Sequence, residues 1–115
     1  MAKTRAQLIE RTLRDLGVAP VGQTANSEEE TSVGDLIDVV VADLSARDVY
    51  YVSDPNNIED EAFIHLARYL AWIAAPEFGL QSDAGIASLG QLAEVNLKII
   101  QSENPTYKTA EIQAW

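Results

Sequence analysis

Apolar residues recur at helical spacing in four stretches of the chain, each bounded by residues that begin or end helices. The first stretch begins at Thr4, where Thr4 and Gln7 form the pattern of a capping box. Gly17 suits the end of this helix, and Pro20 blocks its continuation, so residues 17–26 are expected to form a loop. Its predicted apolar stripe consists of Ala6, Ile9, Leu13 and Leu16.

The second stretch begins at Ser27, with Glu30 completing a second capping box. Residues 39–41 and 49–52 also have strand propensity, but the pattern lasts longer than a strand usually does. We therefore predict a helix that ends at an undetermined point near Tyr50. Its predicted apolar face consists of Val33, Ile37, Val40, Val41 and Leu44.

The third stretch is predicted to follow a loop at 53–57, to be capped by Asn56 or Asn57, and to run from Ile58 or Glu59 to Ala75. Pro76 is expected to end or kink it. Its predicted core stripe consists of Ala62, Phe63, Leu66, Ala67, Leu70, Ile73 and Ala74.

The fourth stretch is predicted to be capped by Asp83 and to end near Gln101. Gly85 and Gly90 either weaken this helix slightly or mark close helix packing. Residues 106–115 lack a helical stripe. The residues expected to face the core are Ile86, Leu89, Leu92, Ala93, Leu97 and Ile100.

The chain is therefore predicted to be all-α, a small bundle of about four helices with an extended C-terminal arm. Residues 1–105 would form the helical domain and residues 106–115 the arm. A length of 115 residues fits one domain with a modest core.

Composition narrows the possible chemistry. The chain has no cysteine and one histidine, which excludes disulfides, a Cys nucleophile and any site with two imidazoles. No glycine-rich phosphate loop or metal-binding pattern is present, so we expect no cofactor, no metal and no catalytic residues. No apolar run approaches the ~20 residues that cross a bilayer, and we expect a soluble protein made in a cytoplasm-like compartment.

Charge is unevenly distributed. The net charge is -10, which disfavours free nucleic acid as the main ligand. Residues 28–61 hold eleven acids and one base, whereas the first sixteen residues hold four bases and two acids. This pattern fits either a solvated acidic face or a head-to-tail contact between identical subunits. The residues concerned are Arg5, Arg11 and Arg14 at the basic end, and Asp35, Asp38, Asp43 and Asp48 on the acidic face or lumen.

His65, Arg68, Tyr69 and Trp72 are predicted to lie near one another, opposite the core stripe of the third helix. They fit an exposed aromatic edge or a subunit interface equally well. Trp115 either folds back on its own core or inserts into a partner, and we favour the partner.

Three features resemble the tailed-phage head-to-tail adaptor proteins, also called head-completion, neck or tail accessory factor proteins. The first is the opening helix that leads into LGVAPVGQ at 16–23, and the second is ARYLAWIAAPEFG at 67–79. The third is the last helix and trailing arm, which occupy 89–115.

The resemblance implies a ring subunit, expected to be a dodecamer, at the head-tail junction of the virion. The ring would dock on the portal protein after DNA packaging and receive a tail or nozzle protein on its other side. Genomic DNA would pass through without specific binding, helped by an acidic lumen. The portal-binding arm would contain Tyr107, Lys108, Ile112 and Trp115.

Two other functions remain open. The His65–Trp72 patch also fits a regulatory domain that binds another protein as a monomer or dimer. A peptidoglycan hydrolase is suggested only by analogy with some members of the resembled family.

Overall fold

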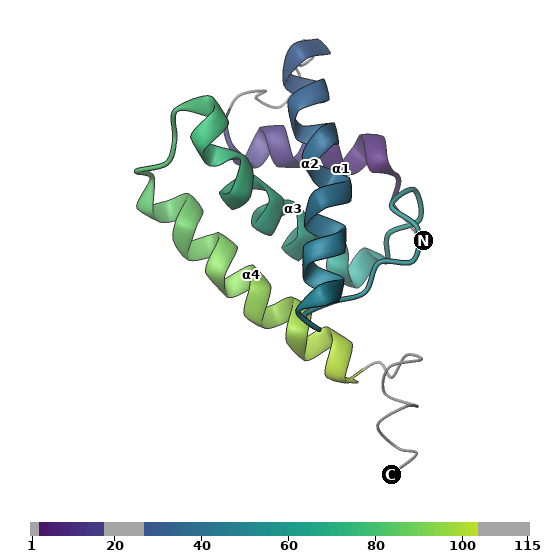
Figure 1. The fold of residues 1–115 in the computed structure, drawn as a ribbon. Helices are drawn as coiled ribbons and strands as arrows, with labels where there is room; N and C mark the ends of the chain where they lie inside the picture. Colours follow the sequence, from purple (N-terminus) through teal and green to yellow (C-terminus); the bar gives the residue numbers. More distant parts are fainter. Residues whose placement is uncertain (1–2, 18–26, 104–115) are drawn as a thin grey trace.

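Four α-helices and one 3-10 helix make up the computed structural model, which describes residues 3–17 and 27–103. The helices are α1 (Arg5–Asp15), α2 (Ser27–Ala46), α3 (Asp60–Ala74) and α4 (Ala84–Glu103), with the 3-10 helix η1 (Ala75–Phe78) after α3. Helix α3 packs against α1, α2 and α4, and α4 runs beside it (Figure 1). The predicted all-α bundle is therefore confirmed for the described residues.

Helix α1 begins as its sequence predicts. The Thr4 hydroxyl accepts a hydrogen bond from the Gln7 backbone N–H at 3.2 Å, and the Thr4 N–H donates to the Gln7 side chain at 2.8 Å. The predicted stripe is shifted, however, because Leu8 is buried and Ala6 is exposed. The buried face follows an i, i+4 row because α1 packs against both α2 and α3. This row comprises Leu8, Thr12 and Leu16, with Leu13 beside it.

Helix α2 continues to Ala46, which confirms helix over strand for residues 39–41. Its predicted face is confirmed: Val33, Ile37, Val40 and Leu44 are buried, and Val41 is half-buried. The chain turns away after Ala46 at Asp48, whose φ of 58° is left-handed and lets the Val49 N–H donate to the Leu44 carbonyl at 2.9 Å. Aspartate tolerates this backbone conformation better than most residues.

Residues 49–52 form no helix and no strand, yet Val49, Tyr50 and Val52 are buried. Burial raises the pKa of the Tyr50 hydroxyl to about 12, and the nearby Glu59 carboxylate adds to the shift. This segment therefore adds to the core as irregular chain.

The start of α3 differs from its prediction. Ile58 does not enter the helix, because its backbone pairs with Lys3 in an antiparallel bridge with hydrogen bonds of 2.7 and 2.8 Å. The N-cap is Glu59 rather than Asn56 or Asn57. The bridge ties the chain ahead of α1 to the chain ahead of α3.

The end of α3 agrees with its sequence. Helix α3 stops at Ala74, Pro76 lies in η1, and Gly79 closes η1 with a left-handed φ of 72°. One core prediction for α3 is wrong, because Ile73 is exposed. The other six predicted core residues are confirmed: Phe63 is half-buried, and Ala62, Leu66, Ala67, Leu70 and Ala74 are buried.

Helix α4 is capped as predicted, since the Asp83 carboxylate accepts from the Ile86 N–H at 3.0 Å. Its core face is only partly as predicted. Ala93 and Leu97 are buried and Ile86 and Ile100 are half-buried, but Leu89 and Leu92 are exposed. The reason lies at Gly90, where an added Cβ would overlap the Cβ of Trp72 and lie 2.7 Å from its Cγ. The small residues of α4 therefore face α3, and Gly90 marks close helix packing.

Candidate assembly surfaces

The outer face of α4 carries a stripe of large apolar side chains, two of which, Leu89 and Leu92, were predicted to face the core. Their exposed fractions are 45% for Leu89, 54% for Leu92, 55% for Val95 and 47% for Ile99. Spacings of three and four residues align them on one side of the helix. We call these four residues the α4 outer stripe. An exposed apolar patch of this kind is typical of a protein–protein contact.

Charge is sparse around the α4 outer stripe. Helix α4 contains only Glu94, Lys98 and Glu103 as charged residues, in a chain with a net charge of -10. The charge of Glu94 is balanced within the chain, because its carboxylate pairs with Arg47 at 2.7 Å. An acidic partner can therefore approach the outer face of α4 with less charge repulsion than it would meet at α2 or α3.

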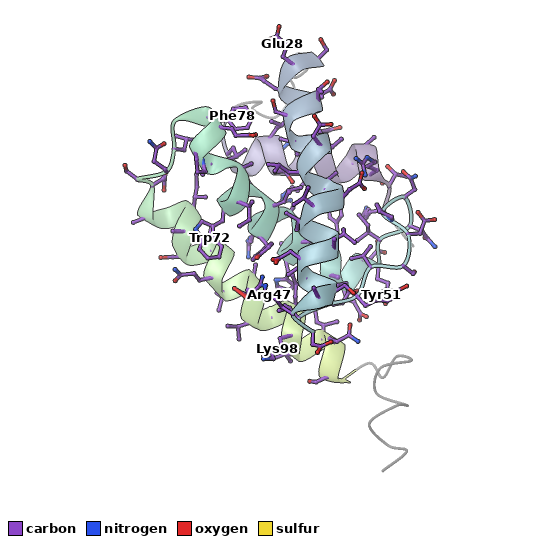
Figure 2. The ribbon with its side chains drawn as sticks, in the orientation of Figure 1. Glu28, Arg47, Tyr51, Trp72, Phe78 and Lys98 are labelled. Atoms are coloured by element: carbon purple, nitrogen blue, oxygen red, sulfur yellow. The ribbon has the colours of Figure 1, made fainter. Side chains whose placement is uncertain are left out.

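Arg47 directly follows α2 and links α2, α3 and α4 through its guanidinium. Figure 2 shows it between α2 and α4. Its guanidinium donates to Asp43 at 3.0 Å, to Glu94 at 2.7 Å and to the Tyr69 hydroxyl at 2.6 Å. The bonds to Glu94 and Asp43 raise the pKa of Arg47, so it stays charged at any practical pH. Arg47 was recognised in the sequence only as the single base in an acidic stretch. Two of its three partners, Tyr69 and Glu94, lie 22 and 47 residues away along the chain, beyond the reach of local patterns.

The aromatic edge predicted on α3 is largely occupied within the chain. Tyr69 is buried, with an exposed fraction of 3%, and its ring meets the Trp72 ring edge-on at 5.8 Å. Trp72 is half-buried against Gly90 of α4 (Figure 2). Tyr69 and Trp72 therefore build the contact between α3 and α4, and Tyr69 is not part of an exposed edge.

His65 and Arg68 are half-buried on α3. Burial lowers the pKa of His65, and the nearby charge of Arg68 lowers it further. The Nδ1 atom of His65 is buried and has no hydrogen-bond partner among the described residues. Both effects favour the neutral form of the imidazole.

The predicted basic residues of α1 have partners in their own chain. Arg5 donates to Asp38 at 3.0 Å and to the Gly34 carbonyl at 2.6 Å, which fixes the crossing of α1 and α2. Arg11 pairs with Asp15 at 3.1 Å, and Arg14 pairs with Glu10 at 2.8 Å. Arg5 thus makes within one chain the contact between basic α1 and acidic α2 that the charge pattern suggested between subunits.

The four predicted acidic-face residues serve different purposes. Asp35 is exposed on α2, and Asp38 and Asp43 pair with Arg5 and Arg47. Asp48 terminates α2 through its left-handed backbone.

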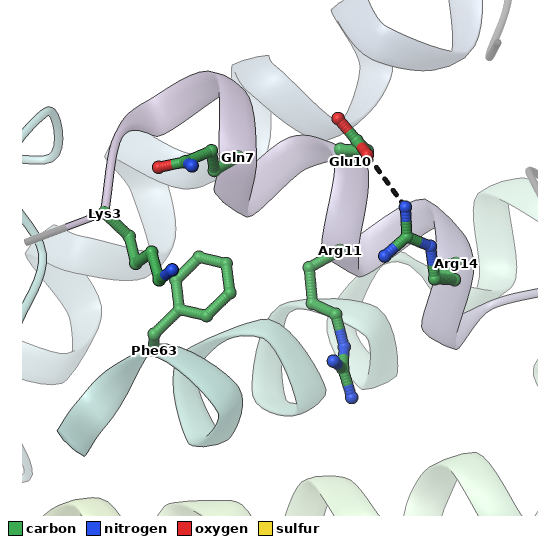
Figure 3. A pocket seen from close by; sticks show the side chains of 6 residues that line it. All are labelled: Lys3, Gln7, Glu10, Arg11, Arg14 and Phe63. Atoms are coloured by element: carbon green, nitrogen blue, oxygen red, sulfur yellow. Dashed lines mark hydrogen bonds and ion pairs between the residues drawn. The ribbon is translucent and has the colours of Figure 1, made fainter. Parts of the chain in front are cut away.

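An open cavity of about 210 Å³ lies beside α1 and the start of α3. Figure 3 shows the six side chains that line it. The Lys3 ammonium lies 5.8 Å from the centre of the Phe63 ring, a cation–π distance. The lining side chains are Lys3, Gln7, Glu10, Arg11, Arg14 and Phe63.

The predicted portal-binding arm residues Tyr107, Lys108, Ile112 and Trp115 lie outside the described residues. Among residues 3–17 and 27–103, the structure groups no three His, Asp or Glu side chains that could hold a metal ion. In the same ranges, no helix is both long and apolar enough to cross a membrane.

No family model, no curated protein and no solved structure matches this chain.

Proposed function

We propose that this chain is a head-to-tail adaptor of a tailed phage: a ring-forming structural subunit that docks on the portal protein after DNA packaging and provides the platform for a tail or nozzle protein. The observation that carries the proposal is the α4 outer stripe. It lies on the last described helix, and the chain that follows it is the segment whose sequence resembles the portal-binding arm of the adaptors.

The position of the stripe supports a docking role. Large side chains on the outer side of α4 gain little in water, and burying each of them is worth about 1 kcal/mol at their present exposure. Helix α4 is about 30 Å long at 1.5 Å per residue, so the stripe forms an extended contact surface along one side of it. We propose that the portal covers this surface.

The charge distribution supports the remaining parts of the proposal. The exposed carboxylates on α2, such as Asp35, would repel DNA phosphates if they faced the lumen of a ring. Genomic DNA would then pass without specific binding. In this proposal the assembled protein resides at the head-tail junction of the virion.

Native mass spectrometry of the chain mixed with the portal protein of the same phage tests the proposal. We expect a complex that contains many copies of the chain per portal ring. A matched chain that ends at residue 105 should lose the complex, because it lacks Tyr107, Lys108, Ile112 and Trp115.

Two results would contradict the adaptor function. One is the absence of any complex with the portal, and the other is full binding by the truncated chain. A complex of one or two copies with another protein would instead favour a regulatory binding domain, the second candidate, for which the α4 outer stripe would also serve as the contact.

A further inference from the structure

The cavity beside α1 is basic, although the chain as a whole is acidic. Three cations line it, Lys3, Arg11 and Arg14, against the single carboxylate of Glu10. Its lining thus has a formal charge of +2, whereas the chain carries -10. The Phe63 ring supplies an apolar wall. A lining of this kind suits a carboxylate-bearing side chain with an aliphatic stem.

The first turn of α2 carries the opposite charge. It contains Glu28, Glu29 and Glu30, and Glu28 and Glu30 are exposed. In Figures 1 and 2 this turn rises above the other helices, with Glu28 at its end. We call residues 27–31 the acidic tip. The exposed carboxylates of Glu28 and Glu30 on this projecting turn can enter a cavity on another molecule.

We propose that the acidic tip of one copy of this chain docks in the basic cavity of a second copy. The two surfaces are different parts of the molecule, so the contact is head-to-tail and can repeat from copy to copy. Glu28 and Glu30 would meet the cations of Lys3, Arg11 and Arg14, while their methylene stems pack on Phe63.

The contact uses only part of the basic end of the chain, namely the residues that line the cavity. Arg5 is not part of this contact between copies, because it already bonds to Asp38 and Gly34 in its own chain. Lys3 has no ion pair with any described residue, and Gln7 is exposed beside it at the mouth. Arg11 and Arg14 each retain further N–H donors beyond the one that bonds to Asp15 or Glu10.

This contact rests on the proposed function only in that its repetition would close the adaptor ring. It is therefore tested in the chain alone, without portal. Its failure would leave portal docking untouched, and a failure to bind portal would leave this contact standing.

Charge reversal with sedimentation velocity tests the contact at about 0.1 M salt, where the Debye length is about 10 Å. The cavity variant is Lys3→Glu with Gln7→Glu, which keeps the capping box because glutamate also suits that position. The tip variant is Glu28→Lys with Glu30→Lys. The matched control for the tip variant is Asp35→Lys with Glu77→Lys, which makes the same change in net charge as that variant at exposed sites elsewhere.

We expect the unmodified chain to self-associate, and each of the two variants to do so at least roughly tenfold more weakly. An equimolar mixture of cavity and tip variants should regain association, because each variant then offers the partner that the other lacks. The control should match the unmodified chain. A monomeric unmodified chain, a control as weak as the tip variant, or a mixture that fails to associate would overturn the proposal.

Disulfide trapping checks the position of the contact independently, since the chain has no native cysteine. Gln7→Cys and Glu28→Cys are made in separate chains and mixed under mild oxidation. We expect more mixed dimer than in the matched mixture of Gln7→Cys with Asp35→Cys. Equal yields in the two mixtures would contradict docking of the tip in the cavity.

Discussion

The two faces of α4 are both apolar, yet only one of them is buried. The inner face offers Gly90, Ala93 and Leu97 to α3, and the outer face offers the α4 outer stripe to solvent. The inner face is defined by small residues that admit the Trp72 side chain rather than by the largest hydrophobic ones. Shape therefore decides which face packs within the chain, and the large apolar side chains of the outer face remain exposed.

The largest expected difference between the two faces is in stability. Leu97→Ala should lower the free energy of unfolding by about 3 kcal/mol, because it removes a fully buried side chain from the α3–α4 contact. Ile99→Ala should cost less than about 1 kcal/mol, since its side chain is half in solvent already. Urea unfolding of both variants measures this contrast. Equal losses would show that the assigned faces are wrong.

A second contrast uses the glycines of α4. Gly90→Ala should destabilise the chain by about 2 kcal/mol, because the new Cβ overlaps Trp72 and forces α3 and α4 apart. Gly85→Ala adds the same methyl group where the nearest atom is the Asp83 carboxylate at 3.2 Å. It should change stability by less than about 1 kcal/mol. Thermal unfolding followed by circular dichroism compares the two, and a neutral Gly90→Ala would refute close packing at this point.

A third substitution tests how much the Arg47 bonds to α2, α3 and α4 stabilise the packing of α4 on the rest of the chain. Arg47→Met should cost about 1 kcal/mol, because it removes bonds to Asp43, Glu94 and Tyr69 from a partly exposed site where water screens the charges. Part of this loss should disappear in high salt, where the ion pairs of the unmodified chain are also weakened. Glu94→Gln serves as the matched control, since it removes one charge and keeps the side chain's shape. A loss that salt does not change would mean that Arg47 stabilises by packing alone.

The smallest expected stability effect belongs to the outer face itself. Leu92→Gln with Val95→Gln should leave the free energy of unfolding within about 0.5 kcal/mol of the original, because neither side chain packs in the core. The double variant should also retain less on a hydrophobic-interaction column. A marked loss of stability would instead show that these residues support the fold.

Local signals in the sequence predicted the helices well. The capping box at Thr4, the cap at Asp83, the proline after α3 and the apolar face of α2 all act over a few residues, and the structure confirms each of them. Features that depend on tertiary contacts were missed. Ile58 leaves the third helix to pair with Lys3, which is distant in sequence.

For the candidate surfaces too, local patterns were predicted from the sequence and tertiary contacts were not. Helical periodicity identified α4 as apolar but could not tell that Leu89 and Leu92 face outward, because Gly90 and Trp72 meet only in the folded chain. The charge pattern identified a basic end and an acidic stretch. It could not show that Arg5 is already engaged with Asp38 and that the acidic tip projects.

Binding of outer-stripe variants to the portal is the most direct test of the proposed docking of the α4 outer stripe on the portal. Leu92→Gln with Val95→Gln should weaken portal binding by roughly a hundredfold, which corresponds to about 3 kcal/mol for two apolar anchors. Val39→Gln with Ile64→Gln, which alters exposed apolar residues on α2 and α3, should bind as tightly as the unmodified chain. Equal binding by all three proteins, or equal loss in both variants, would contradict docking of the α4 outer stripe on the portal.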